Sequence, residues 1–299
     1  MDRNSLTVSV PRLAALVFLL HIQSMPSPAQ STDRSPRVRI DTLADFPSAI
    51  LGRSRTVRIV LPPGYDDNRN RYPVLFMNDG QDLEAMRVPE ILDSLYQKRA
   101  VPPLILVAIH ATGARLQEYG VAASPNAQGL GAEAGKYDRF LLEELNPAIR
   151  QRYRITRSAS RTVVMGASLG GLAAFDLAWN HADVFGKVGV FSGSFWWRSN
   201  DSTVATKQAS RIMHRLVRET RRVPKIRMWL EAGRQDERDD RDGNGVIDAI
   251  QDTRELMEAL ATRGFHEGRE MTYFEVDGGH DPATWGQALP EFLRWAFKP

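Results

Sequence analysis

The segment Arg161–Ala174, which reads R-T-V-V-M-G-A-S-L-G-G-L-A-A, constrains the fold more than any other part of the chain. Its β-branched and apolar residues 162–165 predict a buried strand, and residues 172–179, rich in Ala and Leu, predict a helix. Between them lies a Gly-x-Ser-x-Gly pattern in the strand–turn–helix context of a nucleophile elbow. Glycine is needed on both sides of the serine, because a Cβ atom there would collide with nearby backbone. The segment therefore predicts a strained turn that presents the Ser168 hydroxyl at the carboxyl edge of a sheet.

Short apolar segments alternate with helical periodicity along the rest of the chain. Further strands are expected over residues 55–61, 74–78, 104–110, 187–191, 226–230 and 271–276. Helices are expected over residues 136–150, 253–263 and 289–297. This alternation predicts an α/β fold whose central sheet is mostly parallel and is covered by helices on both faces. In such sheets, functional residues gather at the carboxyl ends of the strands.

The first 29 residues have the pattern of a secretory signal peptide. Arg3 and Arg12 precede the apolar run Leu13–Leu20, and Ser27-Pro28-Ala29 forms a small-x-small cleavage site. The apolar run is too short to span a bilayer, so we expect no membrane anchor. We expect cleavage after Ala29 and a protein that is secreted or periplasmic. A linker or edge segment over residues 30–54 would then precede one catalytic domain over residues 55–299.

Composition excludes several classes of protein. The chain has no cysteine, which excludes disulfides, thiol catalysis and thiolate metal sites. Its 39 Lys and Arg residues are nearly balanced by 36 Asp and Glu and are scattered, so nucleic acid is not an expected partner. No H-E-x-x-H pattern is present, which argues against a zinc hydrolase.

A nucleophilic serine requires a base and an acid that orients the base. In chain order the acid and then the histidine follow the serine of an elbow. His280 fits the base, because it follows the last expected strand in D-G-G-H, where two glycines let the loop turn back. For the acid we prefer Asp236, in the loop after the preceding strand, over Glu231 at the end of that strand.

An oxyanion hole near the serine needs two N–H donors. The first expected donor is the backbone N–H of Leu169, the residue after the nucleophile. The second is expected from the loop that follows residues 74–78, where the backbone N–H of Gln81 has a suitable place.

Residues 240–248 read D-R-D-G-N-G-V-I-D, the front part of a twelve-residue calcium loop. The expected ligands are side-chain oxygens and one backbone carbonyl, from Asp240, Asp242, Asn244, Val246 and Asp248. The twelfth place holds Gln251 instead of Glu, so the bidentate ligand is missing unless Asp252 replaces it. An acidic turn ahead of the next helix is the alternative interpretation. A bound Ca²⁺ would hold Asp236 in position and take no part in the chemistry.

With these residues in place, the chain resembles the putative-esterase family of α/β hydrolases, and most closely its enterochelin-esterase-like branch, which is related to feruloyl and acetyl-xylan esterases. The most specific segments are M-G-A-S-L-G-G, S-G-S-F-W-W, E-A-G-R-Q-D and G-G-H-D-P-A-T-W, and M-N-D-G-Q-D matches the oxyanion segment. The resemblance implies an α/β-hydrolase fold over residues 55–297. It also implies a nucleophile at Ser168, a base at His280, an acid at Asp236 and substrate contacts from Trp196, Trp197 and Trp285.

The expected function is therefore a serine esterase that acts on a small-molecule or carbohydrate ester through an acyl-enzyme, with no cofactor required for the chemistry. Two alternatives remain open from the sequence. The acyl group could pass to a sugar or lipid hydroxyl instead of water, or the fold could serve a binding protein without catalysis.

Overall fold

The computed structural model describes Met1 and residues 37–298. The expected signal peptide and its cleavage site after Ala29 lie outside the described residues. Within that range, eight strands form one sheet in the order β1-β2-β4-β3-β5-β6-β7-β8. Their bounds are β1 Arg39–Ser48, β2 Arg53–Leu61, β3 Val74–Asn78, β4 Ile105–Ile109, β5 Thr162–Ala167, β6 Lys187–Phe191, β7 Arg227–Gln235 and β8 Met271–Gly279.

The sheet is mostly parallel, as the sequence predicted. β1, β2 and β4 pair antiparallel, whereas every pairing from β4 through β3 to β8 is parallel. All residues of β3, β4 and β5 are buried, because helices cover both faces of the sheet. Neither face is open to water, so these strands do not alternate between apolar and polar residues. The segment 30–54, expected to be a linker or edge segment, contributes the edge strand β1.

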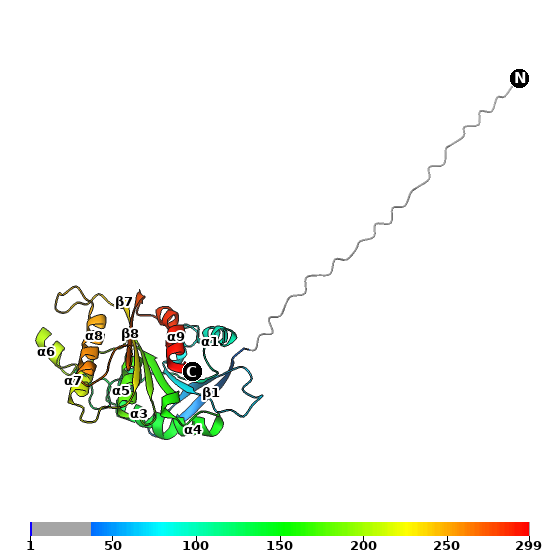
Figure 1. Cartoon of the computed structure of the whole chain (residues 1–299), viewed down its shortest axis with the longest axis horizontal. Helices are drawn as coiled ribbons and strands as arrows, with labels where there is room; N and C mark the ends of the chain where they lie inside the picture. The colour runs from blue at the N-terminus through cyan, green and yellow to red at the C-terminus, as the bar shows by residue number, and fades with distance from the viewer. Residues whose placement is uncertain (2–36, 299) are drawn as a thin grey trace. The chain divides into compact units, whose positions relative to one another are not determined.

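The helices divide between the two faces of the sheet, and each face has its own apolar cluster. On one face, α1 (Val88–Gln97) lies beside α9 (Pro282–Phe297), as Figure 1 shows. The other face carries α3 Ala134–Arg139, the π-helical η2 Phe140–Leu145, α4 Asn146–Arg152, α5 Leu169–Asn180, α7 Ile212–Glu219 and α8 Asp248–Ala261. Shorter helices are η1 Gly80–Asp82, α2 Arg115–Glu118, η3 Ala159–Arg161 and α6 Val204–Ala209.

Three helices differ from the sequence-based expectation. The segment 136–150 is not one α-helix, because the π-helical η2 interrupts it and α4 carries a proline in its first turn. α8 begins at Asp248, five residues before the expected start. α9 begins at Pro282, where the Asp281 side chain accepts hydrogen bonds from the N–H groups of Ala283 and Thr284.

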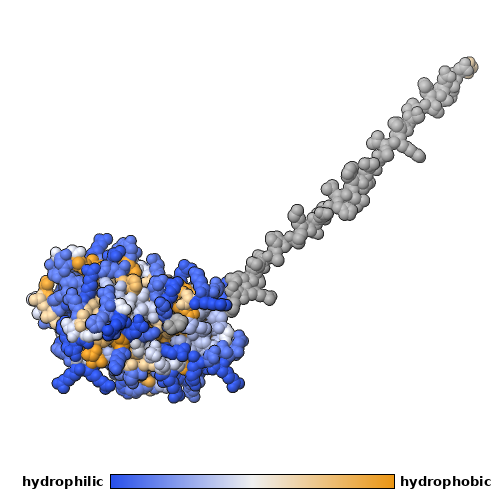
Figure 2. All heavy atoms as spheres, viewed as in Figure 1, coloured by the Kyte–Doolittle hydropathy of each residue, from blue (hydrophilic) through white to orange (hydrophobic). Residues whose placement is uncertain are grey.

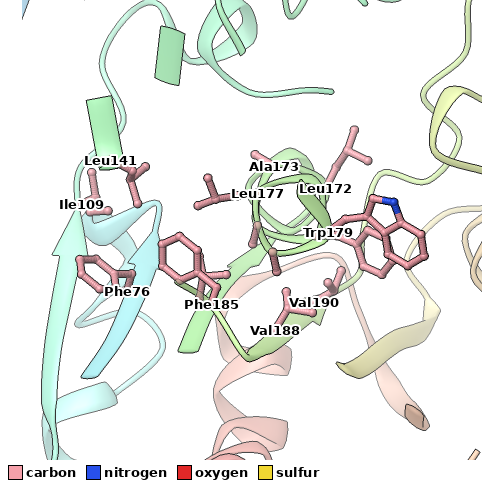
Figure 3. Packing of buried hydrophobic residues seen from close by; sticks show 14 of the residues in the cluster. Phe76, Ile109, Leu141, Leu172, Ala173, Leu177, Trp179, Phe185, Val188 and Val190 are labelled. Carbon is pink, nitrogen blue, oxygen red and sulfur yellow. The ribbon is translucent and has the colours of Figure 1, made fainter. Parts of the chain in front are cut away.

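The elbow helix α5 is the best-buried helix of the fold and packs directly on β6. All its residues except the last are buried, and apart from Asp176 these buried residues are apolar or glycine. Figure 3 shows Leu172 and Trp179 of this helix above Val188 and Val190 of β6. A Cβ atom at Gly171 would lie 2.9 Å from Cγ1 of Val190, so glycine permits the close approach. This packing fixes the helix that follows the nucleophile.

The surface visible in Figure 2 is largely hydrophilic, with hydrophobic residues interspersed. No helix among the residues that the structure describes is long and apolar enough to span a membrane.

Candidate active site

Ser168 lies at the sharp turn between β5 and α5, as the elbow pattern predicted. Its backbone angles, φ 55° and ψ −126°, are strained for a residue with a side chain. A Cβ atom at Gly166 would lie 2.2 Å from the carbonyl oxygen of Gly170, and one at Gly170 would lie 2.5 Å from Oδ2 of Asp79. Gly166 is therefore required by contacts with backbone atoms, whereas Gly170 leaves room for the side chain of Asp79.

The serine opens into a cavity of about 330 Å³ at the carboxyl edge of the parallel strands. The cavity is lined by Ser168, Leu169, Ser192, Gly193, Ser194, Trp196, Asp236, Glu237, Ala249 and His280. These residues follow β5, β6, β7 and β8, apart from Ala249 in α8. The structure thus brings the predicted nucleophile, base and acid to one cavity, although they lie far apart in the sequence.

His280 and Asp236 face each other in this cavity. Nδ1 of His280 lies 3.7 Å from Oδ1 of Asp236, and the Asp236 side chain is only 1% exposed. The hydroxyl of Ser192 donates to Oδ1 of Asp236 at 3.0 Å, and the N–H of Gly233 donates to Oδ2 at 3.1 Å. These two contacts fix the Asp236 carboxyl group beside the imidazole of His280, where an acid that orients the base would lie.

Ser192 and Trp285 contact each other and also contact this pair, Ser192 through Asp236 and Trp285 through His280. Nε1 of Trp285 donates to the Ser192 hydroxyl at 2.9 Å, and the indole ring meets the His280 ring edge-to-face at 5.3 Å between centroids. Ser192 has a positive φ of 47°. Trp285, expected to contact substrate, is 6% exposed and does not line the cavity, so it supports the histidine instead.

Ser194 also contacts the elbow and was not singled out from the sequence. Its backbone N–H donates to the carbonyl oxygen of Ser168 at 3.1 Å, and the two hydroxyl oxygens are 3.4 Å apart. Both Ser192 and Ser194 belong to the S-G-S motif that follows β6. The motif indicates the two serines, but which group each one contacts depends on how β6 and β7 end.

The two expected oxyanion donors have different surroundings. Leu169 is the first residue of α5 and lines the cavity, and N–H groups in the first turn of a helix lack a partner within the helix. Gln81 lies in η1 and is not a lining residue. Its side chain binds Asp79 and the N–H of Ala111. A donor role for its backbone N–H stays a prediction.

Arg115 connects the loop after β3 to the elbow, and no pattern in the sequence predicts this role. Its guanidinium binds both carboxylate oxygens of Asp79, at 2.7 and 2.8 Å. Asp79 has a left-handed backbone with φ 55° and touches Gly170 of the elbow. The two-pronged contact therefore holds the predicted oxyanion segment against the nucleophile turn.

Of the tryptophans in S-G-S-F-W-W, only Trp196 lines the cavity. Trp197 is fully buried and packs against the backbone of Gly120 and Gly131. The structure therefore corrects the expectation for Trp197, which is a core residue without access to a substrate. Adjacent residues in a bend point in different directions, and the sequence does not say which one faces the core.

Glu231, the alternative acid, is 1% exposed at the end of β7. Neither of its carboxyl oxygens has a hydrogen-bond partner among the described residues. Burial, and then the negative charge of Asp236, raise the pKa of Glu231 to about 8. A carboxyl group in this state is neutral at pH 7 and cannot stabilise an imidazolium, which favours Asp236 as the acid.

The expected calcium ligands are engaged with other groups. Asp240 accepts hydrogen bonds from the N–H groups of Asn244 and Gly245. Asp248 is the first residue of α8 and forms an ion pair of 3.0 Å with Arg241. The remaining expected ligands, Asp242 and the Asn244 side chain, contact Gln251, and Val246 donates to Asn244. In the described part of the chain, no group of three His, Cys, Asp or Glu side chains could hold a metal ion.

Comparison with known proteins identifies the family of the chain. The model of the family described as "Putative esterase" matches residues 48–296, which is most of the chain. The chain belongs to the putative esterase family. The expected resemblance and the α/β-hydrolase fold are thus confirmed, and the protein is an esterase whose class needs no cofactor for its chemistry.

Individual relatives are more distant. The uncharacterized protein YbbA of Bacillus subtilis is 25% identical over 248 residues, covering 82% of this esterase and 93% of the relative. The iron(III) enterobactin esterase of Escherichia coli K12 is 26% identical over 240 residues, covering 78% and 52%. The esterase thus spans about half the length of the enterobactin esterases that it matches.

Solved structures show the same fold. A ferulic acid esterase superimposes with a TM-score of 0.68 at 20% identity, covering 88% of this esterase and 98% of that chain. The enterobactin esterase FES of Shigella flexneri, solved in the presence of enterobactin, gives a TM-score of 0.67 at 24% identity, covering 88% and 60%.

Proposed function

We propose that this esterase hydrolyses carboxylic esters through an acyl-enzyme formed on Ser168. The observation that carries the proposal is that Ser168, His280 and Asp236 line one cavity, with Nδ1 of His280 turned toward a buried, doubly hydrogen-bonded Asp236. The separation of 3.7 Å is longer than a hydrogen bond, and such contacts commonly shorten when substrate binds.

In the proposed reaction, His280 takes the proton of Ser168 as its oxygen attacks the ester carbonyl. The carbonyl oxygen becomes an oxyanion that the N–H of Leu169, and a second donor assigned to Gln81, would stabilise. Collapse of the intermediate breaks the ester bond, and His280 gives its proton to the departing alcohol. Water then attacks the acyl group by the same steps and restores the serine.

A fluorophosphonate probe and a set of esters test this proposal together. We expect the probe to label the wild-type esterase and to leave Ser168→Ala unlabelled. We expect hydrolysis of short p-nitrophenyl esters to fall by about 10³-fold or more in Ser168→Ala and His280→Ala. Labelling that persists in Ser168→Ala would contradict the assignment, and a wild type that neither reacts nor hydrolyses would favour a binding protein.

The natural substrate is proposed only as an ester of a small molecule or carbohydrate, with acyl transfer as the alternative outcome. Relatives are described as acting on enterobactin or feruloyl esters. A hydrolysis panel should therefore include feruloyl and acetylated sugars together with ferric and iron-free catecholate siderophores. Adding a sugar or lipid alcohol to the assay separates the two reactions, because transfer gives a new ester instead of the free acid.

Export is part of the proposal because residues 1–29 have a signal-peptide pattern. The test is the N-terminal sequence of protein recovered from the periplasm or medium. We expect it to begin at Gln30, and an intact N-terminus in the cytoplasm would contradict export.

A structural Ca²⁺ at residues 240–248 remains a prediction from the sequence. Such an ion would have to displace Arg241 from Asp248 and the Gln251 amide from Asp242. If Ca²⁺ binds here, its addition should raise the melting temperature, and a chelator should lower the melting temperature and the activity together. A melting temperature that responds to neither would contradict the calcium loop.

A further inference from the structure

The cavity around Ser168 carries negative charge that no lysine or arginine lining it offsets. Among the described residues of its wall, the acidic and basic ones are Asp236, Glu237 and His280. Asp236 has a defined task beside His280, and its two oxygens accept hydrogen bonds from protein groups. Glu237 has no place in the proposed reaction, and it lines the same cavity as Ser168.

Glu237 is held between the cavity and the start of α8. Burial raises the pKa of Glu237, and the N–H of Ala249 in the first turn of α8 opposes this rise. The positive end of a helix is equivalent to about half an elementary charge. When Glu237 is ionised, its full negative charge exceeds the helix contribution, and this side of the cavity is negative.

Arginines on neighbouring segments do not reverse this sign. Arg115 is paired with Asp79 at 2.7 Å, and Arg198 lies 3.3 Å from Asp201. Arg238 follows Glu237 in the sequence, but its side chain is exposed and does not line the cavity. Trp196 also lines the cavity with a half-buried side chain. The Arg198 guanidinium lies 5.9 Å from the centroid of its ring, and the carboxylate of Asp201 offsets that charge. An indole ring can bind an alkylated ammonium group through its face.

We propose that Glu237 is a specificity-determining residue, which makes the esterase prefer esters with a cationic group near the scissile bond over esters with a carboxylate there. The inference rests on the proposed ester hydrolysis and names the substrate class of the same site. It also implies that an anionic iron–catecholate ester is a poor substrate for this chain.

The test compares esters that differ only in charge. Butyryl thioesters with thiocholine, a neutral thiol or 3-mercaptopropionate as leaving group vary the alcohol side, and p-nitrophenyl butyrate against p-nitrophenyl hemisuccinate varies the acyl side. Thiol release is read with Ellman's reagent, to which a chain without cysteine adds no background. In each series the neutral ester is the internal reference, so a general loss of activity cancels in the ratios of kcat/KM.

We expect the wild type to favour the cationic over the anionic thioester by at least roughly tenfold in kcat/KM, corrected for the intrinsic reactivity of each ester. Glu237→Gln should reduce the preference roughly fivefold in at least one series, and Glu237→Lys should reverse its direction. Added salt of about 0.5 M should weaken the wild-type preference, since exposed parts of the cavity are screened.

Asp239→Asn is the matched control, because it removes the same charge two residues away at an exposed position outside the cavity wall. It should leave the ratios as in the wild type. Ratios that do not change in Glu237→Gln, or that change equally in Asp239→Asn, overturn the inference while leaving ester hydrolysis intact. Loss of all hydrolysis in Ser168→Ala, by contrast, reports only on the proposed function.

Discussion

At the scale of single residues, two carboxyl groups near the histidine differ in their hydrogen-bond partners. Asp236 accepts hydrogen bonds on both oxygens, from the Ser192 hydroxyl and the Gly233 N–H. Glu231 is buried next to it with no hydrogen-bond partner on either oxygen among the described residues, which favours the neutral acid. These surroundings, more than position along the strand, favour Asp236 over Glu231 as the proposed acid.

This difference predicts opposite effects of two isosteric substitutions on activity. Asp236→Asn should lower kcat/KM for a p-nitrophenyl ester by about 10²- to 10⁴-fold, because the amide cannot stabilise the imidazolium of His280. Glu231→Gln should change kcat/KM by less than about threefold, because a neutral amide replaces a neutral carboxyl group. Steady-state kinetics at pH 7 measures both, and a larger loss in Glu231→Gln would identify Glu231 as the acid.

The pKa of Glu231 also predicts a change in stability with pH. Below its ordinary pKa of 4.5 the group is protonated in both the folded and unfolded states and has no effect. Between pH 4.5 and about 8 only the unfolded state loses the proton, so the free energy of unfolding falls as pH rises. Glu231→Gln should therefore raise the free energy of unfolding by roughly 1–3 kcal/mol at pH 7.

Urea unfolding of wild type and Glu231→Gln at pH 4.5 and pH 7 measures this effect. The two proteins should be nearly equally stable at the lower pH and should separate at the higher one. A constant difference at both values would show that the glutamate stays ionised or that packing alone is changed.

At the scale of elements, the strand–turn–helix unit of β5 and α5 depends on sterics more than on hydrogen bonds. The nearest atoms that a side chain at Gly166 would meet belong to the backbone of the same turn. Backbone atoms of a buried helix on a packed sheet have little freedom to move. The elbow can therefore form only if that position lacks a Cβ atom.

Gly166→Ala should consequently lower the free energy of unfolding by more than about 3 kcal/mol, or prevent folding. Gly113→Ala is the control, because a Cβ atom there would meet no atom within 4 Å. Thermal unfolding followed by circular dichroism compares the two variants. Equal melting temperatures would contradict the steric account of the elbow.

At the scale of the whole molecule, the parallel strands bring the site together and the antiparallel edge completes the sheet. Phe46 of β1 is 8% exposed and meets Phe140 of η2 edge-to-face at 6.1 Å between ring centroids. The Ser48 hydroxyl donates to Glu144 at 2.5 Å. β1 is therefore part of the folded domain, although it lies before residue 55, where the sequence placed the start of that domain.

The edge strand predicts how far the chain can be shortened. A chain that begins at residue 37 should unfold cooperatively and be fully active. A chain that begins at residue 55 exposes the edge of β2 and the core around Phe140, and its melting temperature should be lower by about 5–15 °C. Calorimetry measures the difference, and equal stability of the two would show that β1 contributes little.

Much of the fold and part of the site followed from local patterns. Buried parallel strands are read from apolar runs, and the elbow is read from glycine spacing, because both depend on neighbouring residues. The break of the 136–150 helix by a π-helical turn was missed, since apolar spacing is similar in both helices. The sequence does not predict the partners of Ser192, Trp285 and Arg115. These partners are Asp236, Ser192 and Asp79, which follow three different strands.

The sequence by itself determined the sharp turn around Ser168 and the parallel architecture, because sterics and hydrophobic periodicity act over a few residues. Only the tertiary structure decided that Asp236 accepts two hydrogen bonds while Glu231 accepts none on its side chain from the described residues, that Trp196 lines the cavity while Trp197 lies in the core, and that Glu237 is part of the cavity wall. Burial and hydrogen-bond partners set these outcomes, and both come from segments distant in the chain.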